Sequence, residues 1–212
     1  EETLAAKGKD EALHLVKDML HKPGSVFYVR QQQPAGLGHA VWCARHLVGS
    51  EPVAVLLADD LILGASCVKE MVDAYKGGNM VAVMDVPHEQ TGSYGIVTPG
   101  ADDGRIVQVE GLVEKPDPSS APSNIAVVGR YIITPDVFET LAAQERGAGG
   151  EIQLTDALAK QIGKAPFSGV RFSGERFDCG SKLGFLQANV AFGLNNDAMR
   201  DQLRDWLGER LG

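Results

Sequence analysis

Helix-like and strand-like patterns alternate along the first half of the chain. Apolar residues at helical spacing predict a helix over residues 4–20, and a Pro-Gly pair then separates it from a strand-like run over 26–29. A glycine turn at 36–40 opens a second predicted helix that continues to residue 47. This order favours an α/β sheet with parallel strands and right-handed crossovers.

Residues 53–58 form a continuous apolar run that ends at Asp59 and Asp60. An unbroken run of this kind is typical of a central strand that is covered on both faces. A helix over residues 67–75 and another buried strand over 80–86 follow, so the alternation of helices and strands continues.

The second half changes character, because strand-like runs follow one another and only Pro, Ser and Gly turns separate them. These runs cover residues 94–98, 106–113 and 125–133. The later elements that we predict are a helix beginning at Thr134 and Pro135, a helix over 154–162, a strand over 170–172, a helix capped by Ser181, and a last helix with Met199, Leu203, Trp206 and Leu211 on one stripe. We therefore predict one α/β domain over residues 1–212, a Rossmann-like open mixed β-sheet flanked by helices, with antiparallel additions in its second half. Within it, residues 195–212 form a C-terminal helix that packs either on its own core or at a subunit interface.

The composition describes a globular chain without general attraction to nucleic acid or anionic lipid. Of its residues 44% are hydrophobic and 23% are charged, and 20 Lys and Arg against 28 Asp and Glu give a net charge of −8. No apolar run approaches the roughly 20 residues that a membrane-spanning helix needs. The three cysteines, Cys43, Cys67 and Cys179, fit neither a disulfide framework nor a paired zinc site, so we expect reduced thiols in the cytoplasm. An anionic substrate would need local cations or a metal.

Three aspartates are candidate metal ligands. Asp59 and Asp60 lie at the carboxyl end of the apolar strand, the edge of an α/β sheet where ligands normally bind. Mg²⁺ takes carboxylate oxygens together with substrate phosphate oxygens, so one or two carboxylates facing a cleft suffice. From position alone, a metal site and a simple turn cap are about equally favoured interpretations of these two residues. Asp178 precedes a glycine turn and a helix, where a single aspartate is more often a structural turn residue.

Two further motifs offer ligand-binding groups, each beside a plain structural alternative. If a helix starts at the Gly36–Ala40 turn, its N–H groups favour an anion or a polar base edge, but such a turn is more often only a connection. Glu114 and Lys115 end a strand pattern, and neighbours on a strand point to opposite faces. We therefore do not expect them to be simply paired, and one or both can face a ligand. On this evidence alone a solvated strand end is the commoner outcome, and His39 is more often a local hydrogen-bond partner than a base.

The order in which these motifs occur along the chain indicates a protein family more specifically than any single motif does. The strings that carry this order are Val29–Gln31, Gly36–Val41, Glu51–Asp60, Ser93–Val97, Val113–Pro116, Ala121–Asn124, Val128–Tyr131, Gly147–Asp156 and Asp178–Gly184. Together they resemble, essentially from end to end, the sugar-nucleotide pyrophosphorylase family, and in particular the bacterial UTP:glucose-1-phosphate uridylyltransferases. The Gly-Leu-Gly-His-Ala and Glu-Ile-Gln-Leu-Thr-Asp strings point to the uridylyl branch of that family rather than the thymidylyl branch.

The resemblance implies a role for each matching position, and a nucleotide-diphospho-sugar transferase type of fold. Gln31 and Gly36 match the positions that recognise the uracil edge. Asp59 matches the carboxylate that holds Mg²⁺, and Asp178 matches the second metal-facing aspartate. Lys115 matches the lysine that holds the sugar phosphate. The implied sugar-contacting positions are Tyr94, Gly95, Glu114, Asn124 and Val128, with Glu114 the acceptor for two glucosyl hydroxyls.

The implied reaction is an in-line displacement at the α-phosphorus of UTP. An oxygen of glucose-1-phosphate attacks, pyrophosphate leaves and UDP-glucose forms, without a covalent enzyme intermediate. Because the nucleophile is already an anion, catalysis rests on positioning and electrostatics. The implied catalytic residues are Asp59, Lys115 and Asp178, while Asp60 is implied only as a neighbour. The family usually self-associates, so we expect a homo-oligomer, a dimer or tetramer.

One signature of the family is missing from the sequence, the opening strand and glycine-rich loop that hold the triphosphate. We expect residues before Glu1, because without that segment catalysis is doubtful and apolar surface near Val55 is exposed. Two rival functions fit the sequence less well. A non-catalytic sugar-nucleotide-binding relative has no need for metal and phosphate groups together, and a nicotinamide-dependent oxidoreductase requires a dinucleotide fingerprint that this sequence lacks. Within the same chemistry, a thymidylyl or other nucleotidylyltransferase stays open, and a comparison of UTP with dTTP decides.

Overall fold

Residues 1–32 form one unit of the chain and residues 33–212 another in the computed structural model, which describes all residues from 1 to 212. The first unit contains two short helices, α1 (Glu2–Ala6) and α2 (Asp10–Asp18), where the apolar spacing predicts one. The predicted strand over 26–29 is wrong. The segment pairs with no strand, and its side chains are exposed, Tyr28 to 95%. A β-propensity run becomes a strand only when a partner strand satisfies its backbone.

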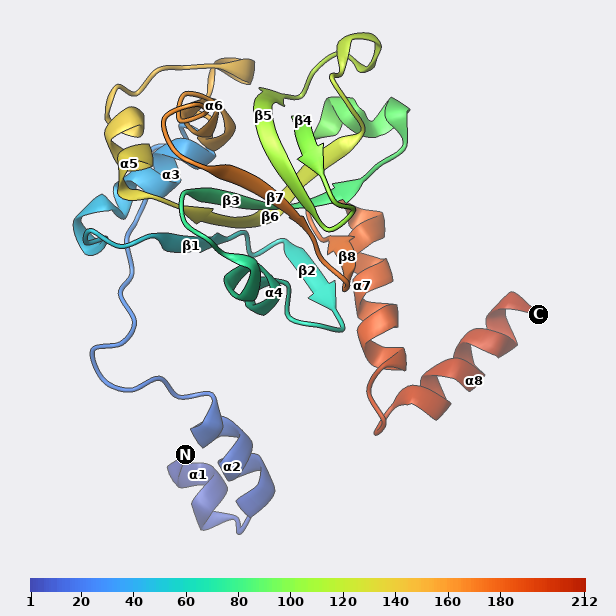
Figure 1. Ribbon diagram of the computed structural model, residues 1–212. Coiled ribbons are helices and arrows are strands. Elements are labelled where there is room, and N and C mark those ends of the chain that lie inside the picture. Colours follow the sequence, from blue (N-terminus) through green and yellow to red (C-terminus); the bar gives the residue numbers. More distant parts are fainter. The chain divides into compact units, whose positions relative to one another are not determined.

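A six-stranded mixed sheet is the centre of the second unit (Figure 1). In spatial order its strands are β1 (Val53–Leu56), β6 (Ile125–Ile133), β3 (Asn79–Asp85), β7 (Phe167–Arg171), β5 (Ile106–Glu114) and β4 (Gly95–Asp102), and β4 also meets β6. Only β3 and β7 pair in parallel. The predicted open mixed sheet with antiparallel additions is confirmed, but β1 and β3 lie on either side of β6 and are not bonded to each other.

Strand β1 lies at the edge of the sheet, so its predicted central position is wrong. It pairs with β6 alone, and its burial alternates along the strand. Val53 and Val55 pack against the core, whereas Leu56 is 52% exposed. A continuous apolar run indicates that both faces of a strand carry apolar side chains. It does not indicate whether one or two strands pair with that strand in the sheet.

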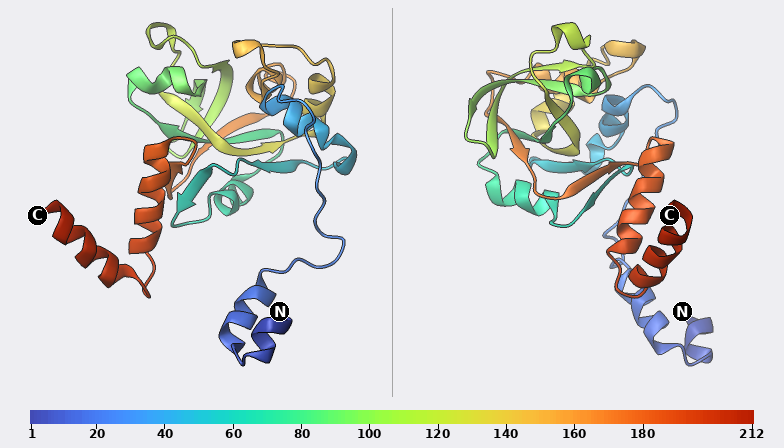
Figure 2. Two further views of the ribbon diagram at one scale, coloured as in Figure 1. Left: turned by 180° about the vertical axis from the view of Figure 1, so that it is seen from behind. Right: turned by 90° about the vertical axis from the view of Figure 1, so that its right-hand side faces the viewer.

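The two faces of the sheet are covered by different helices. In β3, Val81 and Val83 face a core with α3 (Leu37–Cys43), α5 (Pro135–Ala142) and α6 (Leu154–Ala159), as the alternation of side chains along a strand requires. Met80 and Ala82 face the opposite side, where α4 (Cys67–Ala74) packs. Views from two further sides show these helices on opposite faces of the sheet (Figure 2).

A two-stranded antiparallel ribbon, β2 (Asp60–Leu63) with β8 (Glu175–Asp178), stands apart from the main sheet and was not predicted. After β8 the chain enters α7 (Lys182–Leu194), where the Oγ of Ser181 accepts from the Gly184 N–H at 3.0 Å, as the predicted cap requires. The last helix is α8 (Arg200–Leu211). Short 3₁₀ turns complete the fold at η1 (Arg45–Leu47), η2 (His88–Ser93), η3 (Pro118–Ser120) and η4 (Ala148–Gly150). None of the helices combines the length and apolar character that crossing a membrane requires.

Candidate functional site

A cavity of about 320 Å³ in the second unit gathers residues from distant parts of the chain. Its lining residues are Leu37, Leu57, Asp59, Asp60, Ser93, Tyr94, Gly95, Glu114, Lys115, Val127, Gly129, Tyr131, Glu151, Gln153, Thr155, Arg176 and Asp178. Six of the predicted site residues are among them: Asp59, Tyr94, Gly95, Glu114, Lys115 and Asp178. The structure therefore brings the predicted metal-facing and sugar-facing groups to one place.

The ribbon of β2 and β8 accounts for the meeting of the aspartates. Its register places Asp60 opposite Asp178, and the Cys179 N–H donates to the Asp59 carbonyl at 2.8 Å. A Cβ built on Gly180 would lie 3.0 Å from Asp178 Oδ1 and 3.4 Å from Asp59 Oδ2, so both carboxylates lie beside the same glycine. These two carboxylates, from distant parts of the sequence, therefore lie together at the cavity.

Asp60 differs from the other two aspartates because its carboxylate is fully engaged. It is 4% exposed, its Oδ2 accepts from the Gly129 N–H at 2.6 Å, and its Oδ1 pairs with the guanidinium of Arg176. Asp59 forms no ion pair, and the Asp178 side chain is 45% exposed. Asp59 and Asp178 are therefore the carboxylates available to a ligand, and Asp60 is held by the protein.

Glu114 and Lys115 both line the cavity and are paired, which contradicts the expectation from strand alternation. Lys115 Nζ lies 3.8 Å from Glu114 Oε1. The reason is that β5 ends at Glu114, and Lys115 adopts a left-handed backbone conformation with φ of 46°. Its N–H donates to the Tyr94 carbonyl at 2.9 Å. The alternation rule applies only within the strand, so it fails at the residue that follows.

The stretch before α6 and the first turn of that helix contribute alternate residues to the cavity. Glu151, Gln153 and Thr155 line it, whereas Ile152 and Leu154 are buried in the core. The Gln153 amide donates to the Glu151 carboxylate at 3.2 Å. Sequence reasoning gave these residues no role. Glu151 and Gln153 come from the extended stretch before α6, whereas Thr155 lies in the first turn of the helix.

The glycines before and inside α3 have a structural reason to be glycine. A Cβ on Gly36 would lie 2.7 Å from the Ile152 carbonyl, and Gly36 has φ of 108°; a Cβ on Gly38 would lie 2.8 Å from the same oxygen. The Gly38 N–H donates to that carbonyl at 2.8 Å. This helix start therefore packs on the 151–153 segment, so the N–H of Gly38 is not available to an anion.

Four predicted site residues do not line the cavity. Val128 points to the opposite face of β6, because its neighbours Val127 and Gly129 line the cavity, and its side chain packs with Met71 and Met80. Asn124 is exposed before β6, and its carbonyl accepts from the Val86 N–H at 3.0 Å. Gly36 precedes the lining residue Leu37. Gln31 belongs to the first unit, and its role stays a prediction.

The electrostatic balance of the cavity is negative, since its lining has five carboxylates against the two cations Lys115 and Arg176. Burial raises the pKa of the Tyr131 hydroxyl well above its ordinary value, and the Glu114 and Asp60 carboxylates raise it further, so Tyr131 is neutral. Burial alone would lower the pKa of Arg176, but Asp60 and Tyr94 outweigh it and the pKa is raised. Arg176 is therefore a permanent cation of the site.

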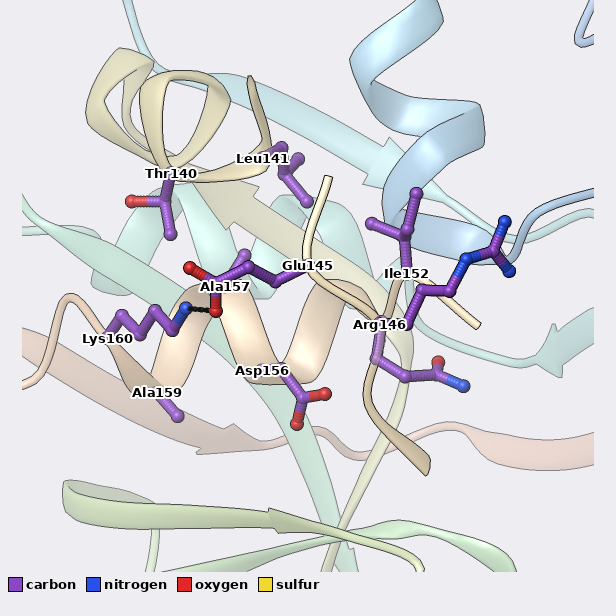
Figure 3. Close-up of a pocket in the computed structure, with 10 residues that line it drawn as sticks. Thr140, Leu141, Glu145, Arg146, Ile152, Asp156, Ala157, Ala159 and Lys160 are labelled. Atoms are coloured by element: carbon purple, nitrogen blue, oxygen red, sulfur yellow. Dashed lines mark hydrogen bonds and ion pairs between the residues drawn. The ribbon is translucent and has the colours of Figure 1, made fainter. Parts of the chain in front are cut away.

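A second cavity, of about 390 Å³, lies between α5 and α6 (Figure 3). It contains the ion pair of Lys160 with Glu145, and Figure 3 shows these two side chains directed toward each other. Of the first cavity's lining it shares only Gln153, and it holds none of the predicted site residues. The first cavity is therefore the candidate active site.

Comparison with known proteins agrees with this arrangement. Residues 8–193 match the nucleotidyl transferase family. The chain is 49% identical to the UTP–glucose-1-phosphate uridylyltransferase of Komagataeibacter xylinus over 98% of this chain and 72% of that protein. It is 44% identical to the enzyme of the same name from Bacillus subtilis, over 96% of this chain and 70% of that protein. The chain belongs to the UTP–glucose-1-phosphate uridylyltransferase family.

Solved structures of this uridylyltransferase family share the fold. A UDP-glucose pyrophosphorylase complexed with UDP-glucose superposes with a TM-score of 0.82 at 38% identity, over 89% of this chain and 73% of that chain. A UTP-bound enzyme from Acinetobacter baumannii superposes with a TM-score of 0.87 at 35% identity, over 98% of this chain and 74% of that chain. The predicted fold class and enzyme class are thus confirmed, and nucleotidyltransferases generally use a divalent metal.

Proposed function

We propose that this chain makes UDP-glucose and pyrophosphate from UTP and glucose-1-phosphate at the first cavity, with Mg²⁺ as the divalent ion. The observation that carries the proposal is the convergence of Asp59, Asp178, Glu114 and Lys115 on one cavity. These residue types match the chemistry, since carboxylates suit a hard cation and sugar hydroxyls while a lysine suits a phosphate.

Glu114 is the proposed acceptor for two hydroxyls of the glucosyl group. Its side chain is 11% exposed, and a Cβ built on Gly95 would lie 3.2 Å from its Oε2. Lys115 is the proposed partner of the sugar phosphate, because it lines the cavity and its side chain is 53% exposed. Tyr94 and Gly95 complete the proposed sugar wall. The proposals for Asn124 and Val128 lose support, because neither lines the cavity.

The carboxylates of Asp59 and Asp178 fit a magnesium ion. Both lie beside Gly180, neither is bonded as closely as Asp60, and no group of three or more such side chains forms a closed cage. Mg²⁺ usually keeps several waters and binds one or two carboxylates with substrate phosphates, so two are sufficient. A net negative lining repels anionic substrates, which is a further reason for a cation there.

In the proposed reaction a phosphate oxygen of glucose-1-phosphate forms a bond to the α-phosphorus of UTP, and the bond from that phosphorus to the pyrophosphate oxygen breaks. Bound Mg²⁺ would supply positive charge to the phosphate oxygens. Lys115 orients the attacking phosphate and offsets its repulsion from the triphosphate, and Glu114 fixes the sugar. No proton has to be removed from the nucleophile, so the site needs no general base.

The remaining predictions are proposals of the same kind. Gln31 and Gly36 are proposed to recognise the uracil edge, as the resemblance implies. Residues 195–212 are proposed as part of a contact between subunits of a homo-oligomer, because Trp206 and Leu211 are exposed on α8. A single domain over 1–212 and a cytoplasmic location stay predictions.

The test is pyrophosphate release by the full protein with UTP, glucose-1-phosphate and Mg²⁺. We expect release that requires all three components, and a rate with UTP well above the rate with dTTP. Binding of UDP-glucose without any release would support the non-catalytic alternative instead. A preference for dTTP would assign the chain to thymidylyl transfer.

A further inference from the structure

Arg176 joins the two sides of the cavity. It lies in β8, and its side chain is 11% exposed. Its guanidinium donates to Asp60 Oδ1 on one side and to the Tyr94 hydroxyl at 3.2 Å on the other, and lies 5.4 Å from the centre of the Tyr94 ring. Asp178 Oδ2 is more distant, at 3.9 Å. One buried cation therefore contacts the carboxylate-bearing ribbon and the proposed sugar wall.

The contacts of Arg176 separate the three aspartates into two kinds. Asp60 receives the guanidinium and the Gly129 N–H, which occupy both of its carboxylate oxygens. Asp178 has only the long contact with the guanidinium, at 3.9 Å, while its Oδ1 accepts from the Gly180 N–H at 3.0 Å, and Asp59 has no cationic partner. Without Arg176, Asp60 would be a buried and uncompensated anion next to the other two carboxylates, and a cation at the site would neutralise it.

We propose that Arg176 is a positioning residue that withholds Asp60 from the metal ion, so that Asp59 and Asp178 alone hold it. The proposal rests on the proposed function, because it assumes that these two carboxylates bind a divalent ion. The physical reason is that affinity for a hard cation rises with the number of carboxylates around it. A third carboxylate would hold the ion more tightly and in a different place, away from the phosphates that it must share.

The test is Mn²⁺ binding, followed by the electron paramagnetic resonance signal of the free aquo ion in the absence of substrates. We expect Arg176→Gln to bind Mn²⁺ at least about tenfold more tightly than the unchanged protein, because a cation is lost and a carboxylate is released. We expect its pyrophosphate release with Mg²⁺ to fall. A residue with only a structural role would lower stability, and it would leave Mn²⁺ affinity equal or weaker.

Asp60→Asn removes the negative partner of Arg176 instead of the positive one. It leaves the Arg176 charge without a partner near Asp178, so we expect weaker Mn²⁺ binding. The double variant Asp60→Asn/Arg176→Gln removes both charges, and we expect its Mn²⁺ affinity to return to within about threefold of the unchanged protein. If Arg176→Gln does not fold, Arg176→Met, which also removes the guanidinium and keeps the Asp60 carboxylate, carries the same test. Were Asp60 itself a metal ligand, the double variant would lack that ligand and its Mn²⁺ affinity would stay clearly below that of the unchanged protein.

Arg130, in β6 of the main sheet, offers a matched control. Its guanidinium also contacts the 57–60 segment, but it donates to the carbonyls of Leu57, Gly129 and Asp60 and not to a carboxylate. Arg130→Gln should therefore lower the melting temperature without tightening Mn²⁺ binding. Arg176→Lys keeps the charge, and it should restore most of the original Mn²⁺ affinity.

Two outcomes separate this proposal from the proposed function. If Asp59→Asn and Asp178→Asn leave Mn²⁺ binding unchanged, the metal site itself is wrong. If those two variants abolish binding while Arg176→Gln binds Mn²⁺ with equal or lower affinity, the metal site stands and the role of Arg176 is overturned.

Discussion

Asp60 lies directly opposite Asp178 in the antiparallel pairing of β2 with β8. This single register brings the start of β2 and the end of β8 together at the cavity. It also places Arg176 opposite Ile62, two residues before Asp178 and on the same face of β8. The candidate metal site is therefore a property of a short ribbon outside the main sheet.

Asp59→Asn should lower the rate of pyrophosphate release by at least about 100-fold, because metal-ion catalysis contributes several kcal/mol to the transition state. The fold should be retained, since the Asp59 side chain is exposed and forms no ion pair. Pyrophosphate release and thermal unfolding measure the two effects. Glu139→Gln, an exposed carboxylate on α5, is the control, and an unchanged rate for Asp59→Asn would refute the assignment.

Lys115→Met should raise the KM for glucose-1-phosphate by about 10- to 100-fold, the equivalent of one hydrogen bond to a charged group. The KM for UTP should change less, because the proposed partner of Lys115 is the sugar phosphate. Initial rates with each substrate varied in turn make the comparison. Lys164→Met removes an exposed lysine outside the cavity and should change neither constant. Equal increases in both constants would place Lys115 elsewhere in the site.

Much of the fold follows from patterns that lie within one element. The run over 125–133 is a strand with those bounds, and Ser181 caps α7 as expected. Errors arose where an element depends on a distant partner, as at the edge strand β1. The ribbon strands β2 and β8 have four residues each, too few for periodicity to identify.

The candidate site was likewise predictable only where its residues belong to recognisable local motifs. Asp59, Glu114, Lys115 and Asp178 were found because their residue types suit the chemistry and their strings match a family. Arg176 was missed because its partner Asp60 is remote in sequence, although its spacing of two from Asp178 placed both on one face of a strand. Val128 was placed in the site by the resemblance, and the pleat of β6 turns it to the other face.

Gly129→Ala should destabilise the protein by about 1–3 kcal/mol, the usual cost of overpacking. A Cβ at this position would lie 2.3 Å from Asp60 Oδ2 and 2.8 Å from the Leu57 Cβ. The new methyl group would therefore push Asp60 away from the Gly129 N–H that it accepts from. Urea unfolding measures the loss, and Gly49→Ala, with open space around its Cα, is the matched control. Equal stability of the two variants would show that the 57–60 segment moves freely.

Cys67 should react with a thiol reagent only after unfolding. It is the first residue of α4 and is buried, and burial raises its pKa to about 11, so almost no thiolate forms at pH 8. Cys43 and Cys179 are half-buried and should react in the folded protein. Titration with Ellman's reagent in buffer and in denaturant counts the thiols. The Cys67→Ala variant identifies the slow one, and fast reaction of all three in buffer would contradict the packing of α4.

Asp102→Asn should lower stability at neutral pH and have almost no effect in acid. Hydrogen bonds from Arg171, at 2.9 and 3.0 Å, and from the Gly104 N–H lower the pKa of Asp102 below its ordinary value of 3.8. A lowered pKa means that the folded state favours the carboxylate, so its stabilisation is present above pH 3.8 and is lost as the pH falls through the folded pKa. The urea midpoints of the variant and the unchanged protein should therefore differ at pH 7 and converge on acidification. Glu209→Gln, an exposed carboxylate on α8, should show no such convergence, and a constant gap for Asp102→Asn would mean that the bridge to Arg171 contributes nothing to stability.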